Sequence, residues 1–140
     1  MIITGKYPYL RLRRSRKFHW SRRLVQENNL SVNDFILPIF LIEGKNKKIP
    51  IKSMPNVYRY SIDMLATIVD KAIRRKIPMV ALFPYTNPKL KNNLGTEALN
   101  ENNLVCQGIR YIKKRYKNSI GIMCDVALDP YTSHGHDGII

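Results

Sequence analysis

Three apolar runs alternate with two amphipathic segments, and this alternation restricts the fold of the chain more than any other feature. The runs cover residues 35–42, 79–83 and 120–128. The first is apolar on both faces and contains β-branched and aromatic residues, which is typical of a strand buried on both sides in a parallel sheet. We predict that all three runs are buried strands.

Helical periodicity follows in the intervals between the predicted strands. Ser61 can cap a first helix whose last turn carries cations at residues 74–76, and Pro78 prevents its continuation. A second helix is predicted over residues 102–117. Residues 43–60, between the first strand and the first helix, are polar and rich in turn-forming residues, so we expect a loop there.

The resulting order of elements contains two right-handed βαβ crossovers. This unit builds both doubly wound sheets and (β/α)₈ barrels, and the order alone leaves both open. No covering helix follows the third strand, and a sheet of three strands would leave two hydrophobic edges bare. We therefore expect the 140 residues to be a piece of a larger fold.

The basic character of the chain raises the question of a nucleic-acid partner. The formal net charge is +14, and residues 6–23 hold eight Lys and Arg side chains with no acid. Aromatic residues lie within this cluster, as in many nucleic-acid-binding surfaces. However, basic residues are abundant along the whole chain, and basic arms also bind acidic partner subunits. We expect no nucleic-acid partner and keep a nucleic-acid-binding module as the weakest alternative.

Membrane insertion and secretion are not indicated. The longest apolar stretch, residues 35–42, contains Pro38 and is far shorter than the roughly 20 residues of a membrane span. The first residues carry arginines where a signal peptide would have its apolar core. Cys106 and Cys124 form no C-x-x-C pair. We expect no membrane partner and a cytoplasmic location.

The residues with the greatest capacity for chemistry gather in residues 125–138. This segment holds three of the ten acidic residues of the chain and two of its three histidines. Asp125 alternates with Met123 and Ala127, so these side chains are expected on one face of the third strand. Its carboxylate would then lie near the carboxyl end of a strand, where α/β barrels hold their active sites.

The loop predicted after this strand allows two interpretations. Asp129, His134, His136 and Asp137 could form a metal site, and carboxylate ligands favour Mg²⁺ or Mn²⁺. Alternatively, this is an ordinary polar loop in which Asp129 caps a turn and His134 hydrogen-bonds a backbone carbonyl. Spacing alone supports both interpretations equally.

Residues 125–138 strongly resemble the metal-site segment of the porphobilinogen synthase family. Supporting similarity occurs upstream, and the resemblance covers about residues 8–140 without large gaps; the supporting segments are residues 11–14, 35–44, 53–59, 61–63 and 80–84. The family condenses two molecules of 5-aminolevulinate to porphobilinogen, with loss of two waters, in tetrapyrrole and heme synthesis.

The resemblance implies a fold and an assembly. The fold class would be α/β, a partial (β/α)₈ TIM barrel with about three of eight strands. Residues 1–34 would be an N-terminal arm that wraps a neighbouring subunit in a homo-oligomer, usually an octamer, with residues 6–23 as its basic part. Residues 35–140 would be the incomplete barrel domain.

The resemblance also assigns site residues. The three cysteines of zinc-dependent members align with Ala127, Asp129 and Asp137, so zinc is not expected here. The aspartate version resembles members that use Mg²⁺ or no active-site metal, with Asp129 and Asp137 as the candidate ligands. Asp125 aligns with an active-site aspartate of the family.

Two lysines from later strands form Schiff bases with the substrates in this family. None of the three predicted strands contains a lysine, and Lys45 lies in a loop expected to be hydrated beside Lys47 and Lys48. We therefore expect the chain alone to be inactive. The alternative from another class is a non-catalytic fragment that binds a full-length homologue.

Overall fold

The structure, a computed structural model, describes residues 5–138 and divides the chain into two compact units, residues 1–31 and 32–140. In the first unit, a 3₁₀ turn at Arg14–Arg16 precedes the short helix α1, His19–Leu24. Ser21 is the one buried residue of α1, and its hydroxyl donates to the Phe18 carbonyl at 2.9 Å. The sequence shows a weak helical pattern over residues 20–28, and α1 ends before it does, at Leu24.

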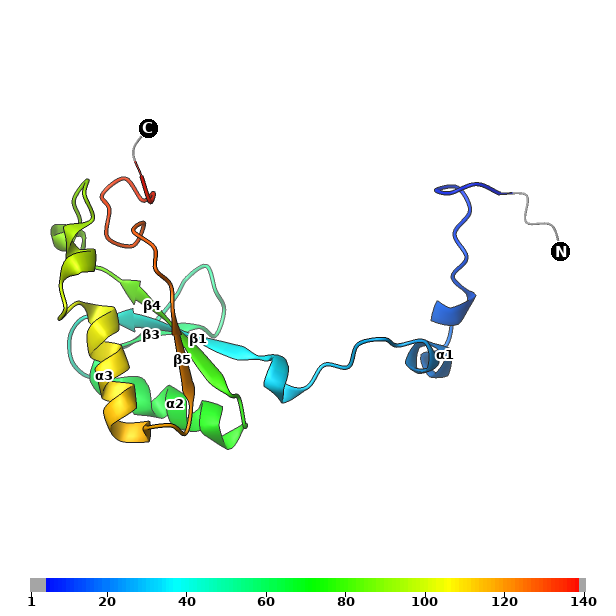
Figure 1. The fold of residues 1–140 in the computed structure, drawn as a ribbon, viewed down its shortest axis with the longest axis horizontal. Coiled ribbons are helices and arrows are strands. Elements are labelled where there is room, and N and C mark those ends of the chain that lie inside the picture. The colour runs from blue at the N-terminus through cyan, green and yellow to red at the C-terminus, as the bar shows by residue number, and fades with distance from the viewer. Residues whose placement is uncertain (1–4, 139–140) are drawn as a thin grey trace. The chain divides into compact units, whose positions relative to one another are not determined.

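The second unit is built on a five-stranded sheet in the order β2-β3-β1-β4-β5 (Figure 1). The strands β1 (Ile36–Ile42), β4 (Met79–Tyr85) and β5 (Gly121–Cys124) are parallel to one another. They confirm the three predicted strands, although β5 ends four residues before the predicted end at Leu128. The prediction of strand over residues 125–128 is therefore wrong.

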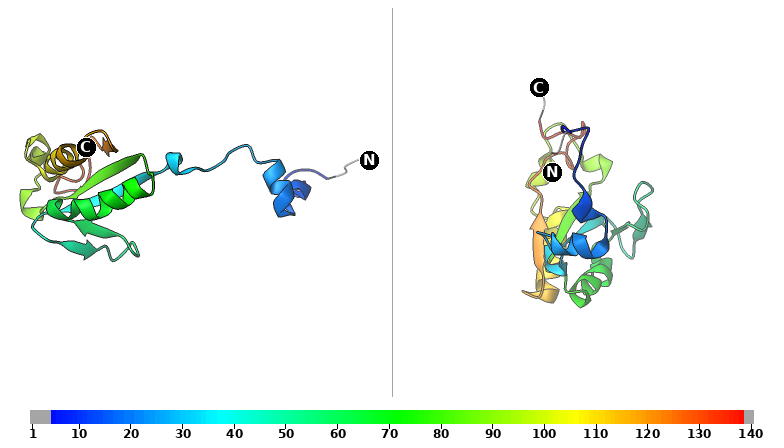
Figure 2. Two further views of the ribbon diagram at one scale, coloured as in Figure 1. Left: turned by 90° about the horizontal axis from the view of Figure 1, so that it is seen from below. Right: turned by 90° about the vertical axis from the view of Figure 1, so that its right-hand side faces the viewer.

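A short hairpin occupies the segment that was expected to be only a loop. Strand β2 (Lys48–Pro50) runs antiparallel to β3 (Tyr58–Tyr60), and β3 pairs in parallel with β1 at Phe40 and Leu41. Figure 2 shows this hairpin in teal at one edge of the sheet. Three-residue strands are too short to show a period of two, so the sequence gives no signal for them.

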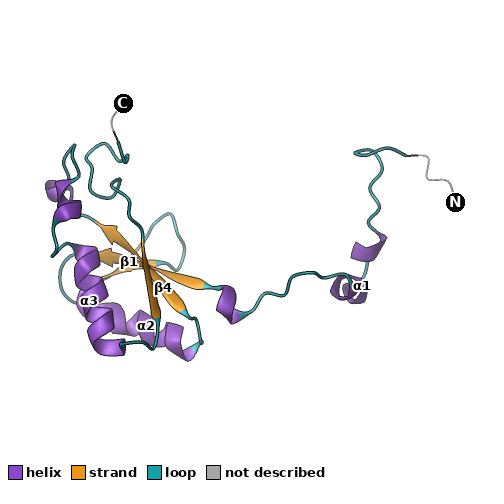
Figure 3. Ribbon diagram, in the orientation of Figure 1, coloured by secondary structure: helices purple, strands orange, loops and turns teal. Residues whose placement is uncertain are grey.

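Two helices cover one face of the sheet (Figure 3). They are α2 (Leu65–Arg74), which follows a 3₁₀ turn at Ile62–Met64, and α3 (Leu104–Tyr116). Their buried side chains form one core with the strands; its members include Ile39, Leu41, Val80 and Leu82 from the sheet and Leu65, Val69, Ala72, Leu104, Val105 and Ile112 from the helices. Because both crossovers lie on the same side, the arrangement is that of a barrel segment and not of a doubly wound sheet.

Close packing of α3 on the strands depends on Gly108. A Cβ atom at this position would lie 3.1 Å from Cδ1 of Leu41 and 3.4 Å from Cδ1 of Leu82. The two helices are also joined, because the Tyr116 hydroxyl donates to Asp70 at 2.7 Å. Burial and this carboxylate raise the pKa of Tyr116.

The opposite face of the sheet is open. Phe40 and Phe83 lie side by side on it with ring centroids 5.7 Å apart, while Ile36 is 44% exposed and Met123 is 43% exposed. The expected burial of residues 35–42 on both faces is therefore wrong for the described residues, since both helices pack on the other face. No helix within residues 5–138 is long and apolar enough to cross a membrane.

Ser61 precedes the first helical turn but does not cap it with its side chain. Its hydroxyl instead accepts a hydrogen bond from the Lys47 amide at 2.9 Å, in the loop after β1. The prediction of a side-chain cap is thus wrong, because a tertiary hydrogen bond takes the hydroxyl.

Candidate functional site

The carboxyl ends of the parallel strands bring three loops to one edge of the sheet. These loops are residues 43–47 after β1, 86–103 after β4 and 125–138 after β5. Parallel α/β sheets bind ligands at this edge, because loops from neighbouring strands converge there. One of these three loops is residues 125–138, in which the sequence predicts the site residues.

Asp137 organises the loop after β5. Its Oδ1 atom accepts hydrogen bonds from the Leu128 amide at 2.7 Å and the Asp129 amide at 3.0 Å. These two donors lower the pKa of Asp137 below its usual value, because they stabilise the carboxylate. The Asp137 carboxylate thereby joins the end of the loop to Leu128 and Asp129.

The loop after β5 is attached to the loop after β4. The Asn92 amide donates to the Tyr131 carbonyl at 3.3 Å, and the Ser133 amide donates to the Asn92 carbonyl at 3.0 Å. The Thr132 side chain, which is buried, donates to the His136 carbonyl at 2.9 Å. Hydrogen bonds therefore hold the backbone of the loop after β5 at Tyr131, Ser133 and His136.

The two histidines lie side by side in this loop. Their rings are stacked with centroids 6.1 Å apart, and the His136 amide donates to Nδ1 of His134 at 3.3 Å. Nε2 of His134 lies 3.3 Å from the Asn93 carbonyl oxygen. This last contact is the one expected from the interpretation as an ordinary polar loop.

Asp125 directly follows β5 and is exposed. It lines a hollow of about 270 Å³ on the open face of the sheet, together with Ala81, Phe83, Met123 and Cys124. Asp125 and Met123 thus share one hollow, as the alternation predicted, even though the strand ends before Asp125.

The donor atoms of the loop bear on the predicted metal site. Within residues 5–138, no group of three or more His, Cys, Asp and Glu side chains is placed to hold a metal ion. One oxygen of Asp137 is already used by two amides, and Asp129 contributes its amide to the same contact. The described residues do not form a complete metal site by themselves, and Mg²⁺ binding by Asp129 and Asp137 stays a prediction.

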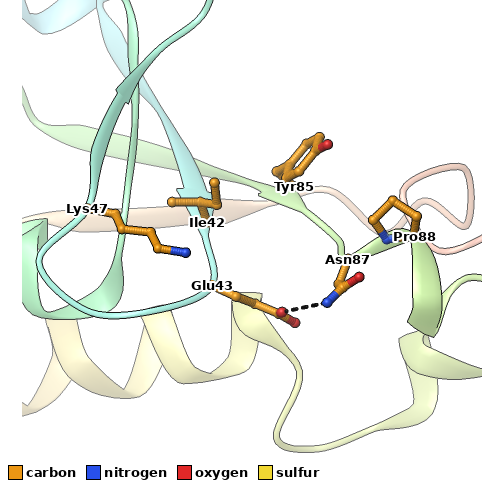
Figure 4. A pocket seen from close by; sticks show the side chains of 6 residues that line it. All are labelled: Ile42, Glu43, Lys47, Tyr85, Asn87 and Pro88. Atoms are coloured by element: carbon orange, nitrogen blue, oxygen red, sulfur yellow. Dashed lines mark hydrogen bonds between the residues drawn. The ribbon is translucent and has the colours of Figure 1, made fainter.

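A second hollow at the same edge was missed by sequence reasoning. It has a volume of about 200 Å³ and lies between the carboxyl ends of β1 and β4; it is lined by Ile42, Glu43, Lys47, Tyr85, Asn87 and Pro88 (Figure 4). The available signal was positional, because Glu43 and Asn87 each follow one of two neighbouring predicted strands. Lys47 is exposed, as expected for a hydrated loop, and its side chain also lines this hollow.

Comparison with known proteins identifies the family. The sequence pattern of the family described as delta-aminolevulinic acid dehydratase matches residues 9–140. The chain belongs to the delta-aminolevulinic acid dehydratase family. This family is the porphobilinogen synthase family to which the sequence was compared above, so that resemblance is confirmed over nearly the whole chain.

Curated relatives carry the same name. The delta-aminolevulinic acid dehydratase of Bradyrhizobium diazoefficiens is 54% identical over 131 residues, which are 94% of this chain and 37% of the relative. That of Ruminiclostridium josui is 42% identical over 93% of this chain and 62% of the relative. The 140 residues therefore span between about a third and two thirds of the length of these relatives.

A solved structure of the delta-aminolevulinic acid dehydratase family has the same fold. The enzyme of Toxoplasma gondii ME49, solved in complex with the reaction product porphobilinogen, matches with a TM-score of 0.80 and 36% sequence identity. The match covers 94% of this chain and 37% of that chain. It confirms the fold class, which is α/β and corresponds to part of a (β/α)₈ TIM barrel.

Proposed function

We propose that the chain is part of a porphobilinogen synthase, which condenses two molecules of 5-aminolevulinate to porphobilinogen with loss of two waters. The observation that carries this proposal is the loop of residues 125–138, held at the carboxyl edge of a barrel segment beside the loop after β4. Membership of the family supports the proposal, since its model matches residues 9–140.

In this proposal the chain supplies one wall of the active site. Asp125, in the hollow beside Met123, is the active-site carboxylate. Among the described strands only β2 carries a lysine, Lys48, and β2 lies at the opposite edge of the sheet from β5. The Lys48 ammonium lies 4.4 Å from the centre of the Tyr58 ring. We propose that the Schiff-base lysines are not supplied by these residues.

We also propose a metal ion and a neighbouring subunit. Mg²⁺ would be held by the carboxylates of Asp129 and Asp137; Oδ1 of Asp137 also accepts from the Leu128 and Asp129 amides. Oxygen ligands of this kind suit Mg²⁺. The exposed basic residues between positions 6 and 23 would bind a neighbouring subunit in a cytoplasmic homo-oligomer.

The proposal is tested by supplying the rest of the barrel. A chimera joins the 140 residues to the remaining part of the Bradyrhizobium relative, and porphobilinogen is measured colorimetrically. We expect turnover by the chimera, none by the chain alone, and no borohydride-trapped adduct on any lysine of the chain. The variant Asp125→Ala should lower the kcat of the chimera, whereas Glu101→Gln, in an exposed loop, should not.

A folded chimera without activity would contradict the proposal that these residues complete the active site. Turnover by the chain alone would instead contradict the inference about the lysines. In both cases circular dichroism of the same preparations shows whether the protein is folded.

A further inference from the structure

We propose that the Arg59 guanidinium pairs with a carboxylate side chain from the strand that closes the barrel on β1, or from the loop directly after that strand. Arg59 lies on β3, between β2 and β1 in the sheet (Figure 1). The carboxylate belongs to the part of the longer relatives that the 140 residues do not span. The inference rests on the barrel fold of the family and not on dehydratase activity.

The Arg59 side chain lies on the open face of the sheet. The register pairs Phe40 of β1 with Arg59 of β3 on one side and with Phe83 of β4 on the other. Register partners in a sheet project to the same face, and Phe40 and Phe83 lie together on the open one. The Arg59 guanidinium agrees with this placement. It lies 4.4 Å from the centre of the Tyr85 ring, and Tyr85 follows Phe83 by two positions on the same strand.

Arg59 is the one charged residue that the described strands place on this face. The other residues of β1, β4 and β5 on this face are apolar or aromatic; they include Ile36, Pro38, Phe40 and Ile42, Met79, Ala81, Phe83 and Tyr85, and Met123. Within residues 5–138 the guanidinium contacts the Tyr85 ring and no carboxylate.

Asp125 does not supply the missing carboxylate. It follows β5, and both β1 and β4 lie between β5 and β3. Neighbouring strands are about 4.8 Å apart, so the backbones at Arg59 and Asp125 are roughly 14 Å apart. This separation is too large for an ion pair while the guanidinium lies on the Tyr85 ring.

Closure of the barrel turns the open face into the interior. The interior of a (β/α)₈ barrel is a packed core of side chains. Arg59 is half-buried in the open sheet already, and the strands that complete the barrel cover the same face. A guanidinium taken out of water without a partner carries a large cost in free energy, so buried charges are paired. A carboxylate matches the guanidinium best, because it accepts two parallel hydrogen bonds.

The edge of β1 shows where this partner enters. Strand β3 pairs with β1 at Phe40 and Leu41, and residues 36–39 have no partner on that side within the described part of the chain. A strand that closes the barrel in parallel on β1 therefore pairs with residues 36–39 and ends where β3 begins. The last residues of this strand, or the loop after them, then lie beside Arg59.

The test uses the chimera described above, which contains the rest of the barrel. The parent chimera, Arg59→Met and Lys48→Met are compared by urea denaturation at pH 7. Lys48 is the matched control. Its ammonium also lies 4.4 Å from the centre of a tyrosine ring, but this ring, Tyr58, packs against the core under the helices. We expect Arg59→Met to raise the equilibrium constant of unfolding roughly a hundredfold or more, and Lys48→Met to raise it less than about tenfold.

The partner is found by changing each Asp and Glu at the end of the closing strand, and in the loop after it, to the corresponding amide. One such change should by itself lower stability about as much as Arg59→Met. Combined with Arg59→Met, it should lower the unfolding constant at least about tenfold relative to Arg59→Met alone, because the double variant leaves no unpaired charge. If Arg59→Met alone does not fold, the double variant should recover a folded protein.

Two results overturn the proposal: Arg59→Met is no more destabilising than Lys48→Met, or none of the amide variants restores stability to Arg59→Met. Unchanged stability of Arg59→Met together with a raised KM for 5-aminolevulinate also overturns it, and shows that the guanidinium binds an anionic ligand instead. Stability is measured without substrate, so a folded chimera that lacks activity still serves the test.

Discussion

Asp137 holds its loop through one oxygen, and this makes the loop sensitive to acid. Because two amides stabilise the carboxylate, the pKa of Asp137 in the folded chain is lower than in the unfolded chain. The stabilisation is therefore complete above the unfolded value of about 3.9 and is lost as the pH falls through the folded value. We expect the protection factors of the Leu128 and Asp129 amides, their exchange rates relative to an unfolded chain at the same pH, to fall below about pH 4, as measured by hydrogen-exchange NMR.

The variant Asp137→Ala, which removes the acceptor oxygen, should lower the protection of the same two amides at neutral pH. Asp129→Ala is the control, since no hydrogen bond to its carboxylate holds this loop together in the described structure. Unchanged protection of the Leu128 amide in Asp137→Ala would show that the loop is held by its contacts with Asn92 instead.

Candidate site residues could be predicted where acids and histidines lie close together in the sequence. Asp125, Asp129 and Asp137 were found because acids and histidines cluster in one short segment. Glu43 and Asn87 are 44 positions apart. They meet because Ile42 and Tyr85 are partners in the β1–β4 register, and that register is not visible in the sequence.

At the scale of elements, the start of α3 depends on Asn103. This residue is 5% exposed, and its Oδ1 accepts from the Cys106 amide at 2.9 Å. The variant Asn103→Ala removes the cap and should lower the free energy of unfolding by about 1 kcal/mol, as measured by chemical denaturation. Asn103→Asp keeps an acceptor at the helix N-terminus and should retain most of the stability. Equal losses in both variants would show that packing of the side chain matters and not the cap.

Helices and long strands were predictable from periodicity, whereas short or interrupted strands were not. The stripes of α2 and α3 match the face they bury, since one-sided packing imposes the period of 3.6 residues. Residues 125–128 alternate like a strand, yet Val126 is fully exposed. Here the Leu128 and Asp129 amides donate to the Asp137 carboxylate, and these hydrogen bonds outweigh the strand preference of the alternating sequence.

For the whole molecule, the open face of the sheet is the main departure from a self-contained domain. The helices cover only the side with Leu41 and Leu82, while Phe40 and Phe83 lie on the other side. Strand β3 pairs with β1 only at Phe40 and Leu41, so the edge at Ile36–Ile39 is unpaired on that side within the described residues. Barrel closure needs a free β1 edge and an apolar interior, and both are present.

An open apolar face and the free edge of β5 should make the 140-residue chain self-associate. Met123 is 43% exposed on β5, and Met123→Lys would place a charge on this face beside the edge. We expect the apparent mass of the parent chain to rise with concentration, and the rise to be much smaller in the variant, as measured by light scattering after gel filtration.

Leu94→Lys is the control, because Leu94 is a 79% exposed apolar residue in a loop outside the sheet, and it should associate like the parent chain. A parent chain that stays monomeric at all concentrations, or equal effects of both variants, would show that the open face does not drive association.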